Sequence, residues 1–103
     1  MNRRRLPNRR AGETIGFEFR GAAYTATFSR FPDDQLAEVF IDCQAKGATP
    51  LDCDAKDVAV ALSLALQFGT PAEAIRAALT READGTPVGI AGAVLDLIEG
   101  GGQ

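Results

Sequence analysis

Three segments in the first half of the chain alternate apolar and polar residues: 14–20, 23–30 and 36–43. A period of two is typical of strands that bury one face. Gly21 and Ala22 separate the first two segments, and glycine at the first central position suits a two-residue type II′ turn. The pattern therefore predicts a three-stranded antiparallel meander.

The two faces of this predicted sheet differ in composition. One face would carry Ile15, Phe17, Phe19, Tyr24, Ala26, Phe28, Val39, Ile41 and Cys43. The opposite face of the third strand would carry Leu36, Glu38, Phe40 and Asp42. Phe40 is then a large apolar side chain on the open face. We expect the helices or the N-terminal arm to cover it; the alternative is a docking surface for a protein partner, formed by Glu38 and Phe40.

Beyond Gly47 the hydrophobic period changes from two to about 3.6, which indicates helices. The segment 55–68 is apolar almost all round, so we expect a helix buried against both the sheet and the other helices. Asp54 is placed to cap its first turn, and Gly69 to end it.

Two further helices are predicted by their start signals. Thr70, Pro71 and Glu73 combine a cap, a first-turn proline and a carboxylate that can reach back, and they start a helix over 71–81. A second threonine-proline pair precedes a helix over 88–99. The predicted fold class is α+β: a three-stranded antiparallel meander packed against a buried central helix and two further helices.

The chain has 103 residues, enough for one domain. Apolar residues make up 46% of it, as in ordinary folded proteins. We expect residues 6–99 to form this domain, 1–5 to be a flexible basic arm and 100–103 to be a frayed tail.

The first ten residues contain five arginines, whereas the rest of the chain carries a formal charge of −8. Such an arm can contact phosphate groups, or it can fold back on its own acidic body or on a neighbouring copy. We expect Arg3, Arg4 and Arg5 to be solvated and 6–10 to lie ordered against the domain.

An anion site is the sharpest binding hypothesis for this charge pattern. Arg9, Arg10 and Lys46 would form it where the arm crosses the end of the sheet, and its ligand would be a nucleotide or nucleic acid. For Lys46 the alternative is an ordinary loop lysine in solvent.

The residue types point away from catalysis by this chain alone. It has no histidine, and its two cysteines cannot by themselves complete a zinc site. We therefore expect no catalytic residues, no metal and no cofactor. The sequence shows no secretory signal and no apolar run of membrane-spanning length, so we expect a cytoplasmic protein whose cysteines, Cys43 and Cys53, are thiols.

The order of several motifs resembles the TSCPD domain, a small module near the C-terminal end of adenosylcobalamin-dependent (class II) ribonucleotide reductases that also occurs as short bacterial proteins. The resemblance covers roughly residues 4–82. It is carried by "LPNRR" (6–10), "EVF" (38–40), "KG" (46–47) and "SLALQFG" (63–69).

The Thr-Ser-Cys-Pro-Asp string that names that domain is missing here, together with its cysteine-bearing tail. The resemblance therefore implies a non-catalytic binding or regulatory module that acts through protein–protein contact or self-association. The alternatives are phosphate binding through the N-terminal arginines, or an accessory subunit of a ribonucleotide reductase.

Overall fold

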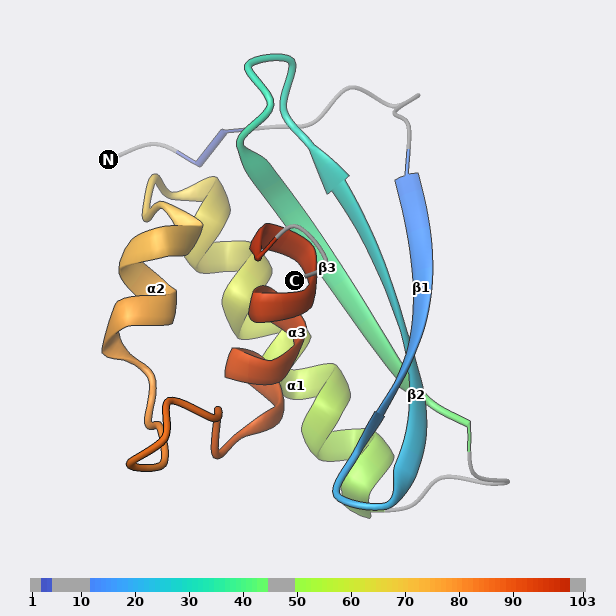
Figure 1. Cartoon of the computed structure of the whole chain (residues 1–103). Coiled ribbons are helices and arrows are strands. Elements are labelled where there is room, and N and C mark those ends of the chain that lie inside the picture. Colours follow the sequence, from blue (N-terminus) through green and yellow to red (C-terminus); the bar gives the residue numbers. More distant parts are fainter. Residues whose placement is uncertain (1–2, 5–11, 45–49, 101–103) are drawn as a thin grey trace.

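The computed structural model describes residues 3–4, 12–44 and 50–100, the side chains of 50–52 excepted. Its elements are β1 (Gly12–Phe19), β2 (Ala22–Arg30), β3 (Leu36–Cys43), α1 (Pro50–Gln67), α2 (Ala72–Ala78) and α3 (Ile90–Glu99). The strands form an antiparallel sheet in the order β1-β2-β3, and the helices lie to one side of it (Figure 1). The predicted α+β fold with a three-stranded meander is confirmed.

The β1–β2 turn lies one residue earlier than predicted. Phe19 pairs with Ala22, so Arg20 and Gly21 occupy the turn. Their φ angles are +51° and +80°. Two consecutive residues with positive φ are the mark of a type I′ turn, which twists the strands in their preferred sense, and not of the predicted type II′ turn.

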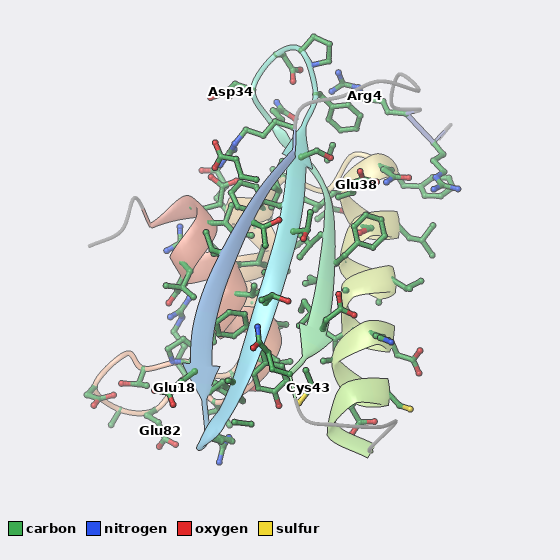
Figure 2. All side chains as sticks on the ribbon, turned by 90° about the vertical axis from the view of Figure 1, so that its right-hand side faces the viewer. Arg4, Glu18, Asp34, Glu38, Cys43 and Glu82 are labelled. Carbon is green, nitrogen blue, oxygen red and sulfur yellow. The ribbon has the colours of Figure 1, made fainter. Side chains whose placement is uncertain are left out.

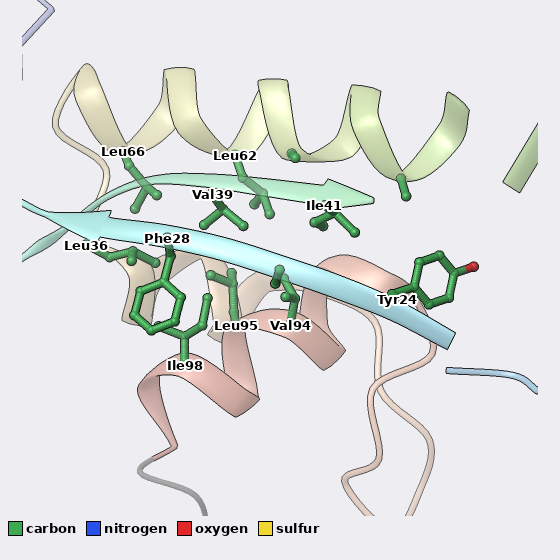
Figure 3. Close-up of a cluster of buried hydrophobic side chains, with 13 residues drawn as sticks. Tyr24, Phe28, Leu36, Val39, Ile41, Leu62, Leu66, Val94, Leu95 and Ile98 are labelled. Atoms are coloured by element: carbon green, nitrogen blue, oxygen red, sulfur yellow. The ribbon is translucent and has the colours of Figure 1, made fainter. Parts of the chain in front are cut away.

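The core lies between the sheet, α1 and α3 (Figure 3). Its most deeply buried large side chains are Val39, Ile41, Val94 and Leu95. The predicted inner face of the central strand is confirmed, because Tyr24, Ala26 and Phe28 are all buried. The alternation of apolar and polar residues therefore located this face of the sheet correctly.

Leu36 is buried in the core, although the alternation placed it on the open face. The β2–β3 register shifts between Ser29 and Arg30, so that Ser29 pairs with Glu38 and Arg30 pairs with Leu36. The extra residue on β3 is Ala37. Such a bulge breaks the period of two and turns the side chain before it to the other face.

Helix α1 begins at Pro50, five residues before the predicted start, so Asp54 lies inside the helix and is not its cap. The expectation that this helix is buried all round is also wrong. One side packs in the core through Ala55, Ala59, Leu62 and Leu66. The other side leaves Val60 and Leu64 exposed, together with Phe68 just after the end of the helix.

The two C-terminal helices are shorter than predicted. Pro71 is the cap residue of α2, not its first residue, and no side chain caps the helix. Helix α3 begins at Ile90, because the segment before it pairs backward: Arg81 forms a β-bridge with Pro87. These backbone bonds hold the threonine-proline pair in a loop instead of a helix start.

Helix α1 lies along the outer edge of β3 and bonds to it. The Ser63 hydroxyl accepts a hydrogen bond from the Val39 N–H (2.9 Å) and donates one to the Val39 carbonyl (3.0 Å). One turn later, the Gln67 side-chain amide donates to the Ala37 carbonyl (3.2 Å). Four helical residues rise about 6 Å and two strand residues about 6.7 Å, so the spacings match. We call this the edge contact.

Replacing Ser63 with alanine should destabilise the fold by about 1–3 kcal/mol, because it leaves both backbone groups of the fully buried Val39 without their partner. Urea unfolding of the wild type and the variant measures the difference. Gln44→Ala, a polar truncation at an exposed position just after β3, is the control and should change the free energy of unfolding little. Equal stability of Ser63→Ala and the wild type would contradict the edge contact.

Candidate docking surface and charged clusters

The three residues predicted to hold an anion, Arg9, Arg10 and Lys46, lie outside the described residues. The anion site therefore stays a prediction. The structure does describe the two arginines at the start of the arm, Arg3 and Arg4.

Arg3 and Arg4 are exposed to solvent, as expected, and both also contact the body of the protein. The Arg4 backbone N–H donates to the carbonyl of Gln67 (2.6 Å), and Arg3 Nε donates to the side-chain oxygen of the same residue. Both cations thus lie near the C-terminal end of α1, where the helix dipole favours positive charge.

The Arg4 guanidinium also has two partners in the β2–β3 turn. It lies 3.7 Å from the centre of the Phe31 ring and 3.2 Å from Asp33 Oδ2. The hydrogen bond from the Gln35 backbone N–H, together with Arg4, lowers the pKa of Asp33. Arg4 is consequently directed inward, toward its own chain.

The two residues proposed as a partner surface, Glu38 and Phe40, differ in their exposure to solvent. Glu38 is only 8% exposed and accepts a hydrogen bond from the Ser29 hydroxyl (2.8 Å). Phe40 is 52% exposed, so the expectation that the helices or the N-terminal arm cover it is wrong. Glu38 is therefore covered, although it lies on the same face of the sheet as Phe40, whereas Phe40 is available for contact.

Phe40 is continuous with an apolar stripe on α1. Figure 2 shows α1 beside β3, so one side of the helix continues the open face of the sheet. An ion pair between Lys56 and Asp42 (3.8 Å) bridges the two elements on this side. Val60 lies one helical turn after Lys56, and Phe40 lies two residues before Asp42. Because the helix and the strand run in opposite directions, both steps lead the same way along the sheet edge. Val60 and Phe40 therefore lie at the same level.

We define the α1–β3 surface as the four exposed apolar residues Phe40, Val60, Leu64 and Phe68. Sequence reasoning found only the first of them. The signal for the others was a second stripe at the spacing i, i+4, i+8, on the side of α1 opposite its core stripe. In a helix that is apolar nearly all round, periodicity alone does not say which stripe faces the core.

A polar cleft of about 340 Å³ lies between the β2–β3 turn, α2 and the end of α3. Its lining includes Arg30, Asp34, Glu73, Arg76 and Glu99. Arg30 Nη1 lies 3.3 Å from Glu99 Oε1 and 3.1 Å from the Asp34 carbonyl oxygen. The first of these contacts pairs an arginine of the cleft with one of its own carboxylates.

Asp96 joins α2, α3 and the loop between them. It accepts from Arg76 Nε (2.9 Å) and from both terminal nitrogens of Arg81 (2.8 and 2.9 Å). Hydrogen bonds from Arg81 first, and then from Arg76, lower the pKa of Asp96 to about 2, against the opposing effect of burial. The geometry is that of a structural clamp.

Within the described residues, no group of three or more histidine, cysteine or acidic side chains is placed to hold a metal ion. None of the helices in that part of the chain has the length and apolar character needed to cross a bilayer. Neither Cys43 nor Cys53 takes part in a disulfide within the described residues.

The chain is similar to a segment of vitamin B12-dependent ribonucleotide reductases. It is 42% identical to the Streptantibioticus cattleyicolor enzyme over 72 residues, which cover 69% of this chain and 12% of that enzyme. The same identity and length hold for the Streptomyces clavuligerus enzyme, of which 7% is covered. With the Agrobacterium fabrum enzyme the identity is 37% over 71 residues, or 6% of its length.

The chain thus spans a small fraction of the curated relatives it matches. No family model and no solved structure matches it. The comparisons therefore show that this chain is similar to one short region of a ribonucleotide reductase.

Asp96→Asn should lower the free energy of unfolding by about 1–2 kcal/mol at neutral pH, because both arginines lose their charged partner at a partly exposed site. The folded pKa of Asp96 is depressed, so its contribution is complete above the ordinary value of 3.8 and is lost as the pH falls through about 2.

Unfolding curves of the wild type and Asp96→Asn should therefore converge between pH 4 and pH 2. Asp57→Asn, at an exposed position of α1, is the control and should remain close to the wild type throughout. A stability difference for Asp96→Asn that does not depend on pH would contradict the clamp.

Proposed function

We propose that this chain is a non-catalytic binding module of the TSCPD type, and that it docks on a ribonucleotide reductase through the α1–β3 surface. The observation that carries the proposal is a coincidence of two features. The chain is similar to a short region of large reductases, and it exposes four large apolar side chains along one helix and the adjacent strand.

The charged groups of the described chain support a role in binding more than in turnover. In the cleft Arg30 is bonded to Glu99, and Asp96 is held by two arginines. Groups engaged in this way stabilise the arrangement of the helices, and they are poorly placed to exchange protons with a substrate. The four side chains of the α1–β3 surface, by contrast, are exposed to solvent, where a partner can contact them.

A reductase is the partner that the comparisons favour. In the relatives, the matched segment is covalently part of a much longer reductase chain, so its natural neighbour is reductase surface. Exposed apolar side chains in a continuous patch are typical of protein–protein contact sites. The proposed role is therefore that of an accessory or regulatory piece of a ribonucleotide reductase.

Leu64→Ser should weaken binding to a purified B12-dependent ribonucleotide reductase from the same organism by about tenfold, because central apolar residues dominate such interfaces. Biolayer interferometry with the immobilised reductase measures the dissociation constant. Leu97→Ser is a matched control: Leu97 is also a helical leucine, 42% exposed against 40% for Leu64, but it lies on α3, outside the α1–β3 surface.

The expected order of affinity is wild type equal to Leu97→Ser and stronger than Leu64→Ser. Both variants should keep the wild-type circular dichroism spectrum, since neither side chain belongs to the buried core. Absence of any complex with the reductase would refute the proposed partner. Equal binding by all three proteins would instead refute the proposed surface.

A further inference from the structure

The outer edge of β1 carries unpaired backbone groups within the described part of the chain. In an antiparallel ladder, successive residues point their N–H and C=O groups alternately to the two sides. The backbone N–H and C=O of Val39 point away from β2, toward Ser63. Those of its β2 partner Phe28 therefore point toward β1, where Phe28 is paired with Glu13. The residues of β1 whose backbone groups point outward are therefore Thr14, Gly16 and Glu18.

The two edges of the sheet are treated differently. The β3 edge is sealed by α1 through the edge contact. Strand β1 pairs only with β2 in the described structure, and it runs for eight residues without a bulge, a proline or a lysine. Those features are the usual protections of an exposed edge. Strand β1 is thus suited to accept another strand.

The inner face of β1 is also incompletely covered. Ile15, Phe17 and Phe19 pack at the border of the core and are only partly buried. Phe17 stacks on Tyr24 of β2, with ring centres 5.5 Å apart. A strand added beside β1 would therefore gain apolar contacts on this face in addition to backbone hydrogen bonds.

We propose that the strand added to β1 is β1 of a second copy, which gives a continuous six-stranded antiparallel sheet across a twofold axis at Gly16. Two strands related in this way pair residues whose numbers add up to 32. In this register each residue with outward backbone groups (Thr14, Gly16 or Glu18) lies opposite another such residue of the second copy. Their N–H and C=O groups can then form the hydrogen bonds of an antiparallel ladder.

This register is self-complementary in its side chains. Ile15 lies opposite Phe17 of the second copy, so the half-buried apolar residues meet. Thr14 lies opposite Glu18 of the second copy, which places a hydroxyl donor beside a carboxylate. Glycine meets glycine on the axis, and no like charges face each other directly. This match favours a second copy over an unrelated strand.

The proposal is independent of the proposed reductase docking. The edge used for self-association is β1, whereas the α1–β3 surface lies at the opposite edge of the sheet (Figure 2). The dimer would present one such surface at each end.

Analytical ultracentrifugation of the full chain over a range of concentrations tests the proposal. The wild type should show a monomer–dimer equilibrium. Gly16→Lys places two ammonium groups opposite each other on the axis and should weaken the dimer about fivefold or more. A β-carbon at Gly16 would come no closer than 4.0 Å to the Tyr24 carbonyl oxygen, so the variant fits the folded chain.

Gly16→Ser is the matched control, because it adds a side chain at the same position without adding a charge. It should dimerise like the wild type. An equimolar mixture of Gly16→Lys and Gly16→Asp chains should form mixed dimers, detected by native mass spectrometry, because opposite charges then meet on the axis.

A wild type that stays monomeric at several hundred micromolar would overturn the proposal. So would a dimer that Gly16→Lys leaves unchanged, since that dimer would use another surface. If the variants fail to fold, hydrogen exchange of the wild type decides: the Thr14, Gly16 and Glu18 amides should become protected as the concentration rises, and constant exchange rates would refute the pairing.

Discussion

The bonds from Ser63 and Gln67 to the outer edge of β3 fix the position of α1, and most features of the surface follow from that position. A helix packed over the middle of a small sheet buries its whole inner half. Here the helix lies beside the edge strand instead, with one side in the core and the opposite side toward solvent. Leu64 and its neighbours lie on this outer side, which continues the open face of the sheet beyond β3 (Figure 2).

Gln67 connects three parts of the chain. Its side-chain amide reaches β3, its side-chain oxygen accepts from Arg3, and its backbone carbonyl accepts from Arg4. Part of the basic N-terminus thus acts structurally, at the end of the same helix that seals the sheet. The arginines of the cleft are also paired with carboxylates, so these charged groups stabilise the fold. Two edges of the described structure remain for contact: the α1–β3 surface at one edge and the open strand β1 at the other.

The sequence predicted the meander and the inner face of the sheet, because alternation reports directly which strand face is buried. The sequence did not place Leu36 in the core, because a β-bulge shifts the β2–β3 register there and the alternation of apolar and polar residues does not reveal the bulge. The boundaries of α2 and α3 were overestimated because backbone pairing around Arg81 outweighs a local cap signal. Of the α1–β3 surface the sequence predicted only Phe40. Helix α1 is apolar on nearly all sides, so its sequence does not show which side faces solvent.

Hydrogen exchange of single backbone amides, followed by NMR in dilute solution, tests the edge contact most directly. If Ser63 seals the strand, the Val39 amide exchanges only through global unfolding, as slowly as amides in the middle of the sheet, whereas the outward Gly16 amide on the other edge exchanges quickly. Fast exchange at Val39, comparable to that at Gly16, would show that α1 does not protect this edge and would contradict the account.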